Sequence, residues 1–276
     1  MEFAFSEEQE MLRGAARRYL SDRRRSEAAW EASSWQELAK LGWTGISVPE
    51  QQGGAGRGFL EEAVLFEEFG RALFRGPYFA TVGLALPALV PRDQARVAAG
   101  QRTFSAALPG CPVPDRELVD EVVVVEDAAT VERVLPRALA ALALEAAGIA
   151  QRALELGVEH AKTREQFGKP IGAYQAVSHK LADTYIETEL ARSLAYWAAW
   201  CVATNDAQAP VAAAAAKSYV ADAAVAACER SVQVHGGIGF TWEHVLHRYY
   251  ERALWIQAFG GYARRHRERV ASALLD

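Results

Sequence analysis

Cysteine is scarce in this sequence, and the three cysteines are far apart. Cys111, Cys201 and Cys228 occur in 276 residues, without the short spacing of a metal site or the density of a small disulfide-bonded protein. Such usage is typical of a protein that folds in a reducing compartment. We therefore expect a cytoplasmic protein that binds no metal.

Long apolar runs, a signal pattern and an excess of positive charge are also missing. No run of roughly 18 or more apolar residues appears, and Met1–Glu8 lacks the charged and then apolar order of a signal peptide. The net charge is −5, with basic residues scattered among acidic ones. We therefore expect neither a membrane nor a nucleic acid as a partner.

Helix-forming sequence is abundant in the first hundred residues. Hydrophobic residues make up 51% of the chain and charged residues 24%, which is enough for one large or two modest domains. Ser6 is followed by Gln9, the pattern of a capping box at the start of a helix. Further helices are predicted over about 34–41, 59–73 and 80–89.

The pattern changes between Val90 and Val134. The runs 104–108 and 122–125 are rich in β-compatible residues, and three prolines lie between them. An interval of about 45 residues has room for about four short strands. We therefore predict a small β insert.

Long helices return from residue 135 onward. They are predicted over about 135–162, 173–204, 210–235, 241–252 and 254–275. Their alanine-rich stretches favour helix formation and close packing, as in an antiparallel bundle. The predicted fold is mainly α, with an N-terminal helical domain at 1–103, a reduced β insert at 104–134 and a C-terminal four-helix-bundle domain at 135–276.

The first candidate binding segment is Arg164–Gly172, a loop between two predicted helices. Its glycines and proline end the helices and bring Arg164 and Phe167 to a surface of the bundle. An arginine there can form paired hydrogen bonds with a pyrophosphate, and an aromatic ring can lie against an adenine. Taken alone, the segment is better explained as an ordinary turn between helices.

The second candidate is Gln233–Phe240, which has three glycines in four residues at a predicted helix end. Glycines allow close approach of a ligand to the backbone, and exposed amides suit an anion. Taken alone, a helix C-cap followed by a turn explains this segment better. The histidines His235, His244 and His247 have no cysteine or carboxylate pattern to complete a metal site, so a surface or interface role is expected.

Together, in this order and at this distance, the two segments resemble the C-terminal domain of the acyl-CoA dehydrogenase family. The N-terminal half agrees in its Leu-Gly-Trp-Thr-Gly-Ile run at 41–46, its Val-Pro-Glu at 48–50 and its Phe-Glu-Glu-Phe-Gly-Arg at 66–71. The likeness spans nearly the whole chain except about 108–134. It implies the family's fold, an acyl-CoA substrate and FAD.

In the family, FAD lies across a subunit interface. The positions that would contact the adenosine and pyrophosphate of the neighbouring subunit's FAD are Arg164, Gln166, Phe167, Gln233, Gly236 and Gly237. Their chemistry suits the task, because a guanidinium binds phosphate, an amide binds oxygen, and glycine permits close approach.

The same resemblance locates losses. The threonine-glutamate-proline run and the tryptophan-bearing strand that cradle the flavin ring cannot be found in the β insert. The usual catalytic glutamate falls on Gly260, and the alternative base position on the first bundle helix falls on Ala138. Leu139 stands where many members have a substrate-binding arginine. The arginine-aspartate pair before the base is reversed as Glu251-Arg252.

Acyl-CoA dehydrogenation needs a carboxylate that takes the α-proton, and Gly260 cannot do so. Glu145 is a weak candidate, because it lies about two helical turns after Ala138 on a similar face, but about 10 Å away along the axis. A polar contact within the bundle is the simpler interpretation of Glu145. No catalytic residue is therefore assigned.

The retained positions serve a neighbour's FAD, whereas the lost ones serve the chain's own. This division resembles the shortened, base-lacking subunit of actinobacterial heterotetrameric acyl-CoA dehydrogenases, several of which act on steroid side-chain CoA thioesters. It implies a full-length catalytic partner in an α2β2 assembly and an electron-transfer flavoprotein or similar acceptor. Two alternatives stay open: a self-sufficient dehydrogenase with a relocated base, and a scaffold or binding protein without chemistry.

Overall fold

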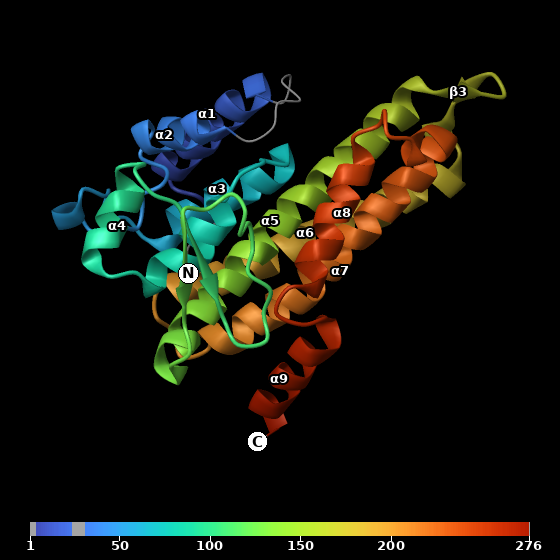
Figure 1. The fold of residues 1–276 in the computed structure, drawn as a ribbon. Helices are drawn as coiled ribbons and strands as arrows, with labels where there is room; N and C mark the ends of the chain where they lie inside the picture. Colours follow the sequence, from blue (N-terminus) through green and yellow to red (C-terminus); the bar gives the residue numbers. More distant parts are fainter. Residues whose placement is uncertain (1–3, 24–30, 276) are drawn as a thin grey trace.

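The computed structural model describes residues 4–23 and 31–275, and it is mostly helical, as predicted. The first three residues, where the sequence shows no signal pattern, lie outside the described part. The N-terminal helices are α1 (Glu7–Arg23), α2 (Ala32–Lys40), α3 (Phe59–Ala72) and α4 (Pro91–Ala98) (Figure 1). The first three match the predicted helices closely, whereas α4 was not predicted.

The start of α1 has the predicted capping box. The amide of Gln9 donates to the Ser6 hydroxyl at 3.2 Å, and the amide of Ser6 donates to the Gln9 side-chain oxygen at 3.1 Å. Two of the amides that a helix start leaves without partners are thereby satisfied. At the end of α2, Gly42 takes a left-handed conformation with φ 77°, which stops the helix where the sequence predicted.

The apolar segment predicted as one helix over 80–89 is irregular. A wide π-helical segment covers Phe79–Ala85 and a 3-10 turn covers Leu86–Ala88. Pro87 lies in that turn and lacks an amide hydrogen, so it cannot continue the hydrogen-bond ladder of an α-helix. The segment is buried throughout its π-helical part.

The β insert is smaller than predicted. Within the described residues it has two strands, β1 (Phe104–Ala107) and β2 (Glu121–Val124), which pair in parallel. The prediction of about four strands was wrong because the proline-bearing loop between them forms no ladder. The insert is closed by Asp120, whose carboxylate accepts from the Thr103 amide at 2.8 Å and hydroxyl at 3.0 Å.

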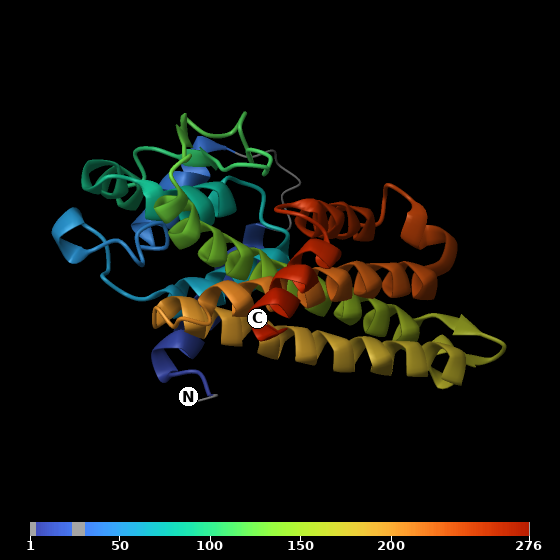
Figure 2. The same ribbon diagram turned by 90° about the horizontal axis from the view of Figure 1, so that it is seen from below.

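The C-terminal part is a bundle in which α5, α6 and α7 run alongside one another (Figures 1 and 2). α5 begins seven residues before the predicted position of 135, because Asp127 caps it by accepting from the Thr130 amide at 2.8 Å. The helices are α5 (Ala128–Thr163), α6 (Gln175–Ala203), α7 (Ala209–His235), α8 (Leu246–Ala258) and α9 (Ala263–Leu275).

The predicted helix break after Arg252 was wrong. α8 continues through this position, and the chain turns instead at Gly260 and Gly261, whose φ angles are 68° and 107°. Such angles favour glycine strongly, so the diglycine is where the backbone reverses into α9.

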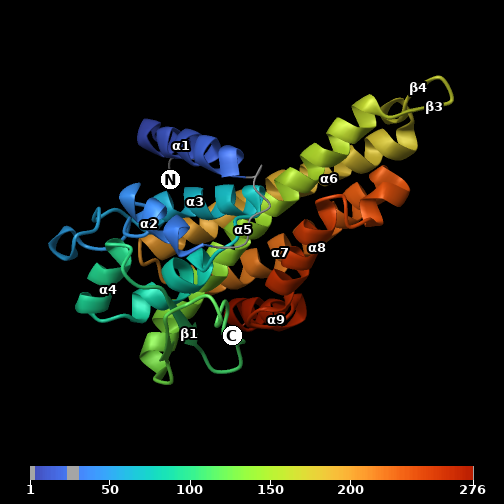
Figure 3. The same cartoon turned by 45° about the horizontal axis from the view of Figure 1, so that its top comes forward.

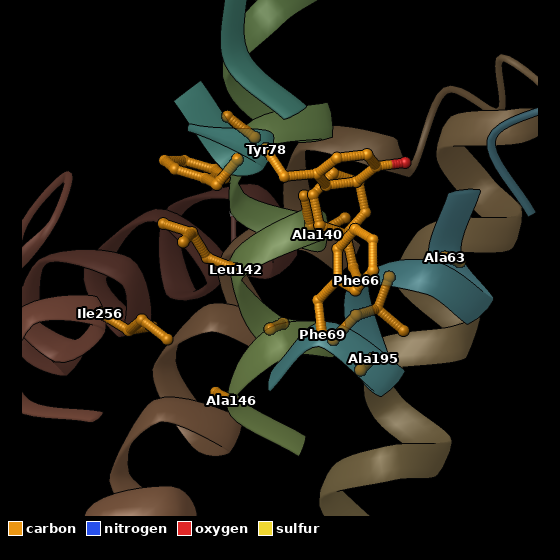
Figure 4. Packing of buried hydrophobic residues seen from close by; sticks show 14 of the residues in the cluster. Ala63, Phe66, Phe69, Tyr78, Ala140, Leu142, Ala146, Ala195 and Ile256 are labelled. Carbon is orange, nitrogen blue, oxygen red and sulfur yellow. The ribbon is translucent and has the colours of Figure 1, made fainter. Parts of the chain in front are cut away.

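Glycines on two helices join the N-terminal part to the bundle. A methyl group on Gly70 of α3 would lie 2.0 Å from the Glu145 carbonyl oxygen, and one on Gly148 of α5 would lie 1.9 Å from the Glu67 carbonyl oxygen. The two helices therefore cross with their backbones in contact. Beside this crossing Phe66, Phe69 and Tyr78 form an aromatic core (Figure 4), in which Phe69 and Tyr78 meet edge to face at 4.4 Å.

Two helical segments, Ala128–Thr163 and Ala209–Phe240, are long and apolar enough to span a membrane by length and composition. Most of each apolar window is buried, 78% and 72% respectively. This is the behaviour of core helices packed inside a helical protein.

Candidate functional site

The first predicted binding segment forms a hairpin at one end of the bundle (Figures 1 and 3). Strand β3 (Glu165–Gln166) pairs antiparallel with β4 (Lys169–Pro170). The two turn residues, Phe167 and Gly168, both have positive φ angles of 54° and 78°, as a two-residue hairpin turn requires. Phe167 is 92% exposed, so its ring is presented to the outside of this chain.

Arg164 lies at the base of the hairpin, directly after α5. Its carbonyl accepts from the Ile171 amide at 2.8 Å, which closes the loop. Its side chain is exposed, and no carboxylate of the described residues pairs with it within 4.0 Å. The guanidinium is therefore available to an anion from outside the chain.

The second predicted segment lies at the same end of the bundle. Gln233 is exposed on the last turn of α7, and a 3-10 segment, η5 (Gly236–Phe240), follows. A methyl group built on Gly236 or Gly237 would meet nothing within 4 Å. Phe240 and Trp242 are each 79% exposed. The backbone of this loop is thus open to close approach by a ligand.

The two segments are joined through aromatic contacts. The ring of His160, in the last turn of α5, stacks on that of His235 at the end of α7, with centroids 4.4 Å apart. The structure thereby places all six predicted cofactor positions at one end of the bundle. A free guanidinium, an open diglycine and exposed rings fit the phosphate and adenine parts of a dinucleotide. We call this set, Arg164, Gln166, Phe167, Gln233, Gly236 and Gly237, the nucleotide clamp.

The position of the missing base is lined by Leu139 and Cys111 at ordinary contact distances. A methyl group on Gly260 would lie 3.4 Å from a Leu139 methyl and 4.0 Å from the Cys111 sulfur. Ala138 is fully buried. Burial raises the pKa of the Cys111 thiol. None of these side chains offers a carboxylate.

Glu145, the weak candidate base, is held by Arg252. Its two carboxylate oxygens accept from the Arg252 Nε at 2.6 Å and Nη2 at 3.0 Å, and the guanidinium lies 4.3 Å from the Trp255 ring centroid. The reversed Glu251-Arg252 pair thus brings an arginine from α8 onto α5. Both oxygens of Glu145 are engaged, which leaves neither directed at a substrate.

Asp115 is a nearby carboxylate that the sequence did not single out. It lies in the loop between β1 and β2 with a positive φ of 50°. Burial raises its pKa to about 6, with Arg252 lowering and Glu145 raising it. Nothing in the sequence marked Asp115 as a site residue, because a single aspartate among prolines is ordinary loop sequence.

Two buried basic groups under the diglycine were also missed. Lys217 Nζ donates to the carbonyls of Gln257 at 3.1 Å and Gly261 at 3.3 Å, and His266 Nε2 donates to that of Gly261 at 3.0 Å. Burial lowers the pKa of Lys217 to about 8 and that of His266 to about 4. A lysine within an alanine-rich helix was the available signal. These hydrogen bonds stabilise the turn at Gly260 and Gly261, where the family has its catalytic glutamate.

Family comparisons agree with this geometry. The N-terminal domain of the acyl-CoA dehydrogenases matches residues 6–90, and their C-terminal domain matches residues 129–275. The chain therefore belongs to the acyl-CoA dehydrogenase family, whose members are oxidoreductases that act on the CH–CH group of an acyl-CoA. The unmatched segment, 91–128, contains α4 and the two strands of the reduced insert.

Individual relatives are also similar. Acyl-CoA dehydrogenase IpdE2 of Mycobacterium tuberculosis is 33% identical over 267 residues, which cover 83% of this chain and 82% of that protein. Acyl-CoA dehydrogenase FadE34 of the same organism is 34% identical over 301 residues, which cover 87% of this chain but only 42% of FadE34.

Two solved structures share the fold over nearly their whole length. A variant of the Tcur3481–Tcur3483 steroid ACAD has a TM-score of 0.88 and 28% identity, covering 97% of this chain and 98% of that one. The ChsE4–ChsE5 complex from Mycobacterium tuberculosis has a TM-score of 0.86 and covers 100% and 99%, but at 23% identity this likeness shows the fold alone.

Proposed function

We propose that this chain is the base-lacking subunit of a heteromeric, FAD-dependent acyl-CoA dehydrogenase. It supplies the part of the FAD site that crosses the subunit interface, and a full-length partner supplies the catalytic glutamate. The observation that carries this proposal is the contrast within one chain. The nucleotide clamp is open, whereas the base position is a glycine, Gly260, lined by Leu139 and Cys111 with no carboxylate.

The remaining structure favours a partner over a homo-oligomer. The insert that would hold the flavin ring has two short strands in the described residues, and neither Gly260 nor Ala138 can take a proton. A pair of identical chains would have two clamps and no base. An α2β2 assembly with a longer homologue would place each clamp opposite a complete flavin pocket.

The chemistry that FAD supplies when bound is acceptance of a hydride from the β-carbon of the acyl-CoA. This chain's contribution is to hold the nucleotide. Arg164 would pair with the pyrophosphate, the open backbone at Gly236 and Gly237 would approach it closely, and Phe167 would lie against the adenine. Electrons would then leave to an electron-transfer flavoprotein or a similar acceptor in the cytoplasm.

For the substrate we propose a steroid side-chain CoA thioester, which undergoes α,β-desaturation. Support comes from the solved structure at 28% identity, which is described as a steroid ACAD with two named components. A match over 98% of one chain of that structure, together with the missing base, favours an assembly of two unlike chains here.

The test is co-expression with a longer homologue that retains the glutamate, starting with one encoded by an adjacent reading frame. We expect a co-purifying yellow complex with one FAD per unlike pair, and little FAD on this chain alone. The same chain carrying Arg164→Gln is the control for the clamp. Stoichiometric FAD and turnover by the isolated chain would contradict the proposal, and a colourless complex would support a scaffold instead.

A relocated base remains testable through Glu145. In the complex, Glu145→Gln should leave the rate of dehydrogenation within a few-fold of the wild type, because both oxygens of Glu145 are occupied by Arg252. Glu251→Gln, on α8 next to Arg252, is the matched control. A loss of several orders of magnitude in Glu145→Gln alone would identify Glu145 as the base.

A further inference from the structure

Four histidines gather beside the nucleotide clamp, and the proposed function does not use them. His235 lies between two other imidazoles: His160 stacks on one side at 4.4 Å, and His244 lies on the other with a centroid distance of 4.4 Å. His247 is linked to His244 through its Nδ1, which donates to the His244 carbonyl at 2.7 Å. We call His160, His235 and His244 the imidazole stack.

Backbone contacts determine which ring nitrogens can receive a proton. His235 Nδ1 lies 2.8 Å from the Ser231 carbonyl, which can only accept, so this nitrogen carries hydrogen. Its Nε2 is therefore a lone pair in the neutral ring. His244 Nδ1 accepts from the Leu246 amide at 3.3 Å, so its hydrogen is on Nε2. His235 therefore keeps Nε2 free for protonation, whereas a proton on His244 Nδ1 would have to replace the hydrogen bond from the Leu246 amide.

The charges around the stack are all of one sign. Arg164, directly after α5, interacts electrostatically with His160, and His247 interacts with His244. His235, at the end of α7, interacts with both His160 and His244. Together with burial, these groups lower the pKa of His160 and His244. No carboxylate of the described residues acts on either ring, and α6, which packs against α5 and α7, adds no charge there.

Two features favour protonation of the imidazole stack in spite of these lowered pKa values. His160 and His235 lie in the last turns of α5 and α7, where the helix dipole favours positive charge. The arriving anion at the clamp would supply the missing negative charge. Burial and positive neighbours oppose a proton on these imidazoles, whereas the helix dipole and a bound anion favour one. A modest change in the surroundings can therefore change their protonation.

We propose that the imidazole stack is a proton-linked extension of the nucleotide clamp, which takes up a proton when a phosphate-bearing ligand binds at Gly236 and Gly237. This inference rests on the clamp of the proposed function and adds its pH dependence. The sign follows from linkage. A bound anion raises the pKa of the stack, so affinity is greatest below the pKa of the free stack and falls as pH rises through that of the bound stack.

The test is NMR titration of the histidine Cε1 protons in the full chain, with ADP, inorganic pyrophosphate or adenosine at millimolar concentration. We expect ADP to raise the apparent pKa of the stack resonances by about one pH unit and adenosine to leave them unchanged. Pyrophosphate separates recognition of phosphate alone from recognition of the nucleotide. ADP affinity should fall up to about tenfold per pH unit in the linked range.

Variants separate the possible failures. His244→Gln and His235→Gln should remove the pH dependence of ADP binding, whereas His179→Gln, an exposed histidine on α6, should retain it. If either stack variant fails to fold, the other carries the test. Binding of ADP with unchanged histidine pKa values would overturn the inference and leave the clamp standing. Absence of ADP binding at pH 5.5 in the wild type would overturn the inference, whereas the clamp of the proposed function stands or falls with FAD retention in the complex.

Discussion

The clamp end of the bundle and the region around Gly260 differ in what they expose. At the clamp, Phe167, Phe240 and Trp242 are largely exposed, and an arginine has no acidic partner among the described residues. Around Gly260, Lys217 and His266 are 1% and 0% exposed. Lys217 Nζ and His266 Nε2 donate to carbonyls of the same chain, whereas His266 Nδ1 is buried with no partner among the described residues. The first region presents apolar rings and an unpaired charge to the outside, whereas the second holds its basic groups against the chain's own backbone.

The two regions should contribute differently to folding stability. Exposed apolar rings and unpaired charge add little to folding stability. Buried polar groups act oppositely, because each must be satisfied internally or it destabilises the fold. Changes at the clamp should therefore alter binding and leave stability unchanged, whereas changes around Gly260 should alter stability and leave binding unchanged.

The largest effect should come from the crossing that supports both regions. In Gly148→Ala, the added methyl would lie 1.9 Å from the Glu67 carbonyl oxygen, so α3 and α5 must separate, and we expect a loss of about 3 kcal/mol or more. Chemical denaturation measures it. Gly14→Ala is the matched control, since its methyl meets only a flexible Arg18 atom at 3.6 Å and alanine favours helix. Equal stability of the two variants would contradict the backbone contact.

A large effect that depends on pH is expected at Lys217. Its pKa is about 8 in the fold, against an ordinary value of 10.5, so the unfolded chain binds more protons between these values. Stability of the wild type should therefore rise from pH 8 to 10.5 relative to Lys217→Met, by up to about 3 kcal/mol. Denaturant unfolding across this range checks it. Lys162→Met, on an exposed surface residue, is the control, and parallel wild-type and Lys217→Met curves would contradict the shift.

A smaller effect, on binding alone, is expected at the clamp. Arg164→Gln should weaken FAD retention in the complex by about ten- to hundredfold, as loss of a charge-assisted hydrogen bond does. The midpoint of thermal unfolding of the isolated chain should stay within a degree or two. Arg264→Gln, an exposed arginine on α9, is the control. A shift in the unfolding midpoint with unchanged FAD content would show that Arg164 contributes to stability and not to binding.

The smallest effect should come from Gly260→Ala. The methyl has room, with its nearest neighbour at 3.4 Å, but the φ of 68° disfavours any side chain, and we expect a loss of about 1 kcal/mol. Urea unfolding measures it. FAD content of the complex should not change, and a loss of FAD in this variant would show that the Gly260 region contributes to the cofactor site.

Much of this could be predicted from the sequence, for reasons that are local. Ser6 with Gln9 and the left-handed Gly42 set helix ends within a few residues of themselves, and the structure has both as expected. The interruption between two helices at 164–172 was also predicted, but the hairpin within it was not. Whether the six predicted cofactor positions bind FAD stays a prediction.

The misses depended on contacts between distant segments. The helix α8 runs past Arg252, whose guanidinium pairs with Glu145, 107 positions earlier. His160 joins His235 only after α5 and α7 have packed together. The two parallel strands of the insert could not be told from a larger set, because β-compatible runs do not reveal their partners.

The length of α5 has a further consequence. From Leu139, beside Gly260, to Arg164 at the clamp the helix advances about 37 Å at 1.5 Å per residue. Charges in solution are screened over about 8 Å at physiological ionic strength. Protonation or deprotonation of Lys217 or His266 therefore has little electrostatic effect at the clamp. The helix α5 thus keeps the two electrostatic environments apart, so that a change around Gly260 need not alter the charges at the clamp.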